Sequence, residues 1–252
     1  MTRIRFQQSL EDLKELLLVM AGLAEQAIQR AIEAYRVRDL SICDLVNRSE
    51  MAINRMEREI DQAALDLLAM EQPMAIDLRF ILSVIKINAD LERVGDSAKA
   101  ISDRVRSMEQ MAQAELPVDI PRMATLASEM VRKSLQSFIE ADAELALTVL
   151  TMDDAVDQMN RSSYKTLTKV MEESSHLAPQ ALNALMISRS LERVADHATN
   201  ISEDVIFWVQ GDDVRHHKSV AKAAALGAAA APSPSEAAPI DTTPAGTAPA
   251  QS

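Results

Sequence analysis

The six residues LERVGD at positions 91–96 recur as LERVAD at positions 191–196, a spacing of 100 residues. A second matching pair, MAGLA at 20–24 and MATLA at 123–127, lies at a spacing of 103. The matches keep the same order in both halves of the chain, which indicates an internal duplication. We therefore expect two related units, the second with a slightly shorter loop before its last element.

The residues around these repeats predict helices. The chain has five glycines and seven aromatic residues (one Trp, two Tyr and four Phe) among 252 residues. So few glycines exclude the many turns of a β-sandwich or barrel, and also glycine-rich phosphate loops. Apolar residues recur every three or four positions, as in a helical bundle. We expect an all-α body of six helices: one carrying an apolar stripe over 10–31, then about 40–70, one carrying the stripe 78–108, then about 122–141, 143–173 and 179–210.

Prolines and composition suggest the boundaries. Residues 1–114 form the predicted first three-helix bundle, and 115–121, with two prolines, the linker. Residues 122–217 form the predicted second three-helix bundle. Residues 218–252 are rich in Ala and hold five of the nine prolines. Such a segment buries too little apolar surface to offset its ordering entropy, so we expect a disordered tail.

Charge and cysteine content narrow the function. The net charge of −12 argues against sequence-independent binding of nucleic acid, which needs a basic surface, and fits cations or basic protein partners. The single cysteine, Cys43, cannot form an internal disulfide, which favours a reducing compartment. Charged residues interrupt the N-terminal apolar run, and no later stretch is long enough to span a membrane, so we expect neither a signal peptide nor a membrane span.

Carboxylates stand one helical turn apart in both repeats. Glu92 and Asp96 share one helix face, and Glu192 and Asp196 do the same in the second unit. Like charges at this spacing repel each other by a few tenths of a kcal/mol. Their presence therefore calls for either a bound cation or a solvated face.

The predicted helix over about 40–70 carries a second polar stripe, which includes Glu50 and Asn54. An antiparallel hairpin with its turn near 72–74 would bring this stripe opposite the carboxylates of the next helix. It places Glu50 opposite Asp96, and it places Asn54 opposite Glu92. The same folding of the second unit pairs residues 153 and 157 with 196 and 192. Such oxygen-rich clusters suit Mg²⁺, Mn²⁺ or iron. The candidate metal ligands are Glu50, Asn54, Glu92 and Asp96 in the first unit, and Asp153, Asp157, Glu192 and Asp196 in the second. The alternative is a solvated acidic face with Arg93 and Arg193 as internal counterions.

Four segments resemble the PhoU family of phosphate-uptake regulators. They are QPMAIDLR at 72–79, LERVGD at 91–96, LERVADHATNI at 191–201 and WVQGDDVRH at 208–216. The resemblance implies two tandem three-helix bundles with pseudo-twofold symmetry, and multinuclear metal clusters on E/D-xxx-D motifs, with Mg, Mn, Fe or Zn as candidate ions. Asn54 departs from that motif, which implies weaker binding at the first site.

The resemblance also implies a function. Members of the family are cytoplasmic accessory proteins of the high-affinity phosphate ABC transporter. They link its ATPase subunit to the membrane sensor histidine kinase and repress phosphate-starvation genes when phosphate is ample. For this chain we accordingly expect a homodimeric, cytoplasmic, non-enzymatic negative regulator, which reaches the inner face of the membrane through its partners.

Two other classes stay open. A di-metal carboxylate enzyme would use Glu-x-x-His motifs, and the chain has one, from Glu173 to His176, at a predicted turn and without a counterpart in the first unit. His197 has Ser97 as its counterpart, so it is at most an accessory ligand. A helical adaptor without metal is the second alternative. It predicts that replacing the carboxylates leaves stability and partner binding almost unchanged.

Overall fold

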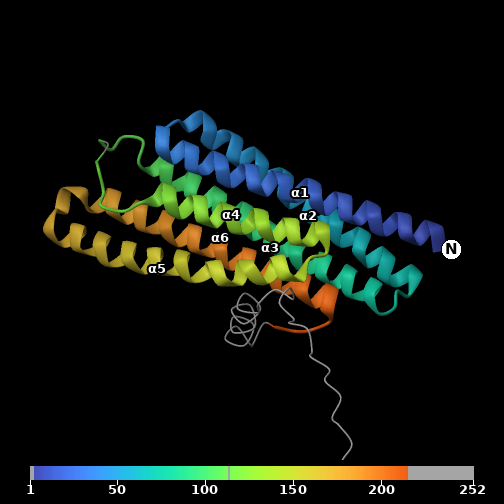
Figure 1. The fold of residues 1–252 in the computed structure, drawn as a ribbon. Helices are drawn as coiled ribbons and strands as arrows, with labels where there is room; N and C mark the ends of the chain where they lie inside the picture. The colour runs from blue at the N-terminus through green and yellow to red at the C-terminus, as the bar shows by residue number, and fades with distance from the viewer. Residues whose placement is uncertain (1–2, 113, 215–252) are drawn as a thin grey trace, which may run out of the picture.

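The computed structural model describes residues 3–112 and 114–214. Six long helices and no strand make up this part of the chain, which confirms the all-α prediction (Figure 1). They are α1 (Arg3–Val37), α2 (Leu40–Glu71), α3 (Ile76–Ser107), α4 (Ile120–Glu140), α5 (Ala143–Glu173) and α6 (Ala178–Gln210), with a short 3₁₀ helix, η1 (Ser175–Leu177), before α6. The predicted tail, 218–252, and the last residues of the predicted second bundle lie outside the described residues.

Helix ends follow local chemistry. Asp39, Asp119 and Asp142 precede α2, α4 and α5, and each accepts a hydrogen bond from a backbone N–H of the first turn. Gln72 ends α2 in the left-handed conformation, with φ of 47°. Pro73 follows it, and the chain reverses into α3 at Ile76, so the α2–α3 turn lies where the sequence predicts it.

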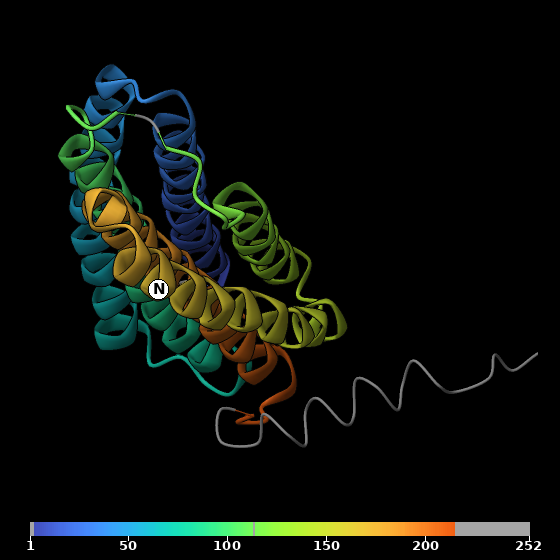
Figure 2. The ribbon, with the colours of Figure 1, turned by 90° about the vertical axis from the view of Figure 1, so that its left-hand side faces the viewer.

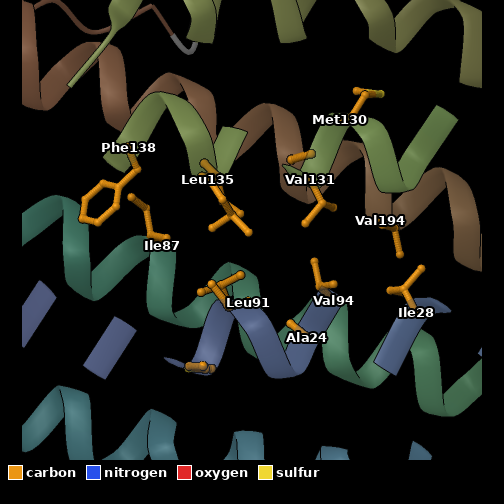
Figure 3. Close-up of a cluster of buried hydrophobic side chains, with 14 of the residues drawn as sticks. Ala24, Ile28, Ile87, Leu91, Val94, Met130, Val131, Leu135, Phe138 and Val194 are labelled. Carbon is orange, nitrogen blue, oxygen red and sulfur yellow. The ribbon is translucent and has the colours of Figure 1, made fainter. Parts of the chain in front are cut away.

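One apolar core runs through both repeats. Figure 3 shows side chains of α1, α3, α4 and α6 meeting in it, among them Ile28, Leu91, Val131 and Val194. All four are at most 1% exposed. The two three-helix units therefore share a continuous core, and neither buries its apolar faces alone.

The central helices α3 and α6 pack against each other in antiparallel orientation. Near the start of α3, Arg79 donates from Nε to the Trp208 carbonyl at the end of α6, over 3.1 Å. Farther along α3, Asp90 meets His197, which lies earlier on α6. Viewed end-on, α2 and α4 lie on opposite sides of the bundle (Figure 2). Each of the α2–α3 and α5–α6 hairpins has a face toward solvent, with Arg93 and Asp96 exposed on α3 and Arg189 and Arg193 exposed on α6.

None of the helices in the described ranges combines the length and apolarity needed to cross a lipid bilayer.

Candidate functional site

The structure brings the predicted ligands of the first repeat together on the α2–α3 hairpin. We call Glu50, Asn54, Glu92 and Asp96 the first acidic face. Partial burial raises the pKa of Glu92 above its usual value, and the negative charges of Asp96, Glu57 and Glu50 raise it further. Carboxylates of α2 thus act on a carboxylate of α3, as the predicted hairpin register requires.

Asn54 has one satisfied and one unsatisfied polar atom. Its Nδ2 donates to Glu50 Oε1 over 2.7 Å. Its Oδ1 is buried and makes no hydrogen bond within the described part of the chain. A buried amide oxygen beside carboxylates is an acceptor that a cation can satisfy, because a cation needs only lone pairs.

The second repeat repeats the arrangement. Asp153, Asp157, Glu192 and Asp196 form the second acidic face, on α5 and α6. Partial burial raises the pKa of Glu192, and so do the charges of Asp196, Asp157 and Asp153, while the charge of Arg189 opposes the rise. In both hairpins, carboxylates of two helices lie within electrostatic reach of a partly buried glutamate, Glu92 or Glu192, and the two glutamates occupy matched positions.

The counterions differ in part from the predicted pair, Arg93 and Arg193. Arg93 does lower the pKa of Glu92, as proposed. For Glu192 the opposing cation is Arg189. Lys99 was not among the predicted site residues. It donates to Asp103 over 2.9 Å, and its pKa is raised by that bond, by the charge of Asp103, and by the charges of Glu50 and Asp96. Its position three residues after Asp96 on the same helix was the available clue.

The acidic faces are not preformed metal cages. Among residues 3–112 and 114–214, no three Asp, Glu, His or Cys side chains stand close enough together to hold an ion as they are. The donors are nevertheless all oxygen atoms, which fits hard cations. Asp96 is exposed, so it can change rotamer toward a cation without disturbing the core.

The other residues considered in the sequence lie elsewhere. His197 is buried against Asp90 of α3, with 2.9 Å between Nδ1 and Oδ1, and so takes part in the contact between the repeats. Glu173 and His176 are both exposed near η1. Cys43 is buried in a small apolar cluster beside Ala34 and Val105, as expected of a core residue.

Comparison with known proteins finds the same repeat. The PhoU domain profile matches residues 17–105 and again residues 120–205. The "Phosphate-specific transport system accessory protein PhoU homolog" of Pseudomonas aeruginosa is 37% identical over 215 residues, covering 84% of this chain and 88% of the relative. The Escherichia coli "Phosphate-specific transport system accessory protein PhoU" is 32% identical over 214 residues, with 84% and 88% covered.

Solved structures share the fold. The crystal structure of PhoU from Pseudomonas aeruginosa superposes with a TM-score of 0.80 at 36% identity, covering 82% of this chain and all of that one. The PhoU structure from Streptococcus pneumoniae, titled a phosphate transport system regulatory protein, gives a TM-score of 0.77 at 27% identity, with 83% and 99% covered. The six-helix, two-repeat architecture is therefore common to all three chains.

Proposed function

Because the chain belongs to the PhoU family, we propose that it is a metal-binding regulator of phosphate homeostasis that acts as an accessory protein of a phosphate-specific ABC transporter. The relatives that it matches carry that accessory role in their names. We propose that the protein has no enzymatic activity. In this role it restrains both the transporter and the phosphate-starvation response when phosphate is ample.

The observation that carries the metal-binding part is the paired electrostatics of Glu92 and Glu192. Each has a pKa raised first by partial burial and then by the charges of carboxylates on both helices of its hairpin. Mg, Mn, Fe or Zn ions would neutralise this charge and tie α2 to α3 and α5 to α6. The residues that would hold metal are Glu50, Asn54, Glu92 and Asp96 on the first face, and Asp153, Asp157, Glu192 and Asp196 on the second.

The proposed partners follow from the family role. The protein would contact the transporter ATPase subunit and the membrane sensor histidine kinase from the cytoplasm, as a homodimer. Its net charge of −12 suits basic surfaces on such partners.

Metal analysis of the purified protein tests the proposal. The variant E92Q/D96N/E192Q/D196N should lose the metal that the native protein carries, and with it the rise in melting temperature that metal gives. The control removes four charges from exposed helix positions, at Glu11, Glu59, Glu144 and Glu172, and should keep the metal. Absence of metal from the native protein would favour the adaptor without metal, and equal metal content in the two variants would contradict binding at the acidic faces.

Co-purification tests the regulatory part. The full chain should retain the transporter ATPase subunit and the sensor kinase, and the amount retained should change between phosphate-rich and phosphate-poor medium. Failure to bind either partner at any phosphate level would exclude the regulatory role. Turnover that disappears in the quadruple variant would instead support a di-metal enzyme.

A further inference from the structure

A groove between α5 and α6 lies directly beside the second acidic face. It encloses about 710 Å³, within the range of small-molecule sites. Four cations line it, together with Glu192 and Asp196, so its lining carries a net positive charge. These cations are Arg161, Lys165, Arg189 and Arg193, and we call the site the cationic groove.

The first repeat provides an internal comparison, because its residues match by the two repeat spacings. Lys165 stands where the first repeat has Gln62, and Arg189 stands where it has Ala89. Each of these differences adds one positive charge to the second repeat.

Two acidic positions change in the same direction. Asn160 replaces Glu57, and Tyr164 replaces Asp61. One change runs the other way, since Met186 stands where the first repeat has Lys86. That lysine, however, pairs with Asp204 across the repeats, at 2.9 Å. Around this groove, the hairpin of the second repeat is therefore more positively charged than the matched hairpin of the first repeat.

A metal site does not explain this change. Cation binding favours negative surroundings, and the second repeat instead surrounds its carboxylates with positive charge. Part of that positive charge neutralises the carboxylates, because Arg161 forms an ion pair with Asp157 at 2.8 Å and the charge of Arg189 opposes the rise in the pKa of Glu192. Lys165 and Arg193 widen the positive lining beyond these two contacts.

The remaining lining has an aromatic and apolar character. Tyr164 is 59% exposed, and Leu185 and Met186 also line the groove. An exposed ring beside apolar side chains offers a stacking surface for an organic group. Arginine side chains, in turn, bind phosphate oxygens through paired N–H donors.

We propose that the cationic groove binds a phosphate-bearing small molecule. Lys165, Arg189 and Arg193 hold its phosphate oxygens, and Tyr164 and Met186 flank whatever organic part it carries. This inference goes beyond the proposed function, because it requires neither bound metal nor a protein partner.

Calorimetric titration of the full, chelator-treated chain tests the proposal at fixed ionic strength. The probes are orthophosphate, tripolyphosphate and ATP, with sulfate as the reference anion. At least one phosphate probe should bind more tightly than sulfate. Tighter binding of ATP than of tripolyphosphate would identify an organic phosphate as the ligand, and equal binding would identify the phosphate group alone.

The matched variants come from the first repeat. K165Q/R189A installs the residues that the first repeat carries and should weaken binding at least about tenfold. R93A removes the first-repeat counterpart of Arg193 and should leave binding within about twofold. R189K, which keeps the charge and the fold but not the fork of donors, should fall between them.

Three results would overturn the inference: no binding of any phosphate probe at about 1 mM, sulfate binding as tight as that of the best probe, or equal losses in K165Q/R189A and R93A. Melting curves of all variants verify folding. The titration uses metal-free protein without its partners. Absence of phosphate binding would therefore not contradict the proposed regulatory function, and absence of partner binding would not contradict phosphate binding in the groove.

Discussion

His197 Nδ1 on α6 lies 2.9 Å from Asp90 Oδ1 on α3, in a buried contact between the two repeats. Asn200 donates to the same oxygen over 3.1 Å. The matched positions, Ser190 and Ser97, cannot form the same pair, so the contact exists once and breaks the symmetry of the duplication. It therefore favours one register of α3 against α6.

Replacing His197 with Ala should destabilise the protein by about 2 kcal/mol, because it removes a partner from a buried carboxylate. Denaturant unfolding measures the change. S97A is the matched control: its hydroxyl bonds within its own helix, to the Arg93 carbonyl, and its loss should cost less than about 1 kcal/mol. Equal losses would show that the Asp90 contact contributes little.

Gly95 allows a close approach of α3 to α2. A Cβ at this position would lie 2.9 Å from Ile53 Cδ1 and 3.4 Å from its Cγ2. The second repeat has a different pair of residues at the matched positions, Ala195 and Val156. Valine lacks the Cδ1 atom that the alanine Cβ would strike.

The Gly–Ile pair of the first repeat should be replaceable by the Ala–Val pair of the second. G95A alone should gain about 1 kcal/mol of helix propensity and lose about 1–3 kcal/mol to overpacking. I53V alone should cost about 1 kcal/mol. The double variant G95A/I53V should be more stable than the sum of the single changes predicts, by at least about 1 kcal/mol in a double-mutant cycle. Additive effects would mean that Ile53 moves aside freely.

Much of the architecture could be predicted from sequence. The predicted helix over 143–173 coincides with α5, and the break at Pro73 correctly placed the α2–α3 turn. That turn fixed the hairpin register, and the register brought Glu50 within electrostatic reach of Glu92. These features depend on periodicity and on one turn, both of which are local properties of the chain.

The packing between repeats could not be predicted in this way. Nothing local indicates that Asp90 faces His197, because their separation along the chain says nothing about which faces of α3 and α6 meet. The counterion Arg189 was missed because a long side chain can reach several neighbours on adjacent turns. The role of Lys99 was missed for the same reason.

Lys86 and Asp204 form another contact between the repeats, and its contribution to stability can be tested. The Asp204 side chain is 6% exposed, and Lys86 Nζ also lies 5.0 Å from the Phe207 ring centroid. K86M, which installs the residue of the second repeat, should destabilise by about 2 kcal/mol in denaturant unfolding, because it takes a cation from a buried carboxylate. K169M breaks an exposed pair with Glu173 and should change stability by less than about 0.5 kcal/mol. A similar loss in both variants would contradict the importance of burial.

The acidic faces should make the metal-free protein less stable as pH rises. The pKa values of Glu92 and Glu192 are raised in the folded state, by burial first and by neighbouring carboxylates next. The folded protein therefore binds protons at these groups more readily than the unfolded chain does. The resulting stability is present at low pH and is lost as pH rises through the folded pKa values.

Replacing both glutamates with Gln removes this dependence. In chelator-treated protein, E92Q/E192Q should be more stable than wild type at about pH 7.5, and the difference should shrink toward about pH 5. Unfolding free energies at several pH values measure it. Added metal should reverse the order at the higher pH, because only wild type keeps the full set of ligands. A constant difference between the two proteins across this range would show that neither carboxyl group has a raised pKa.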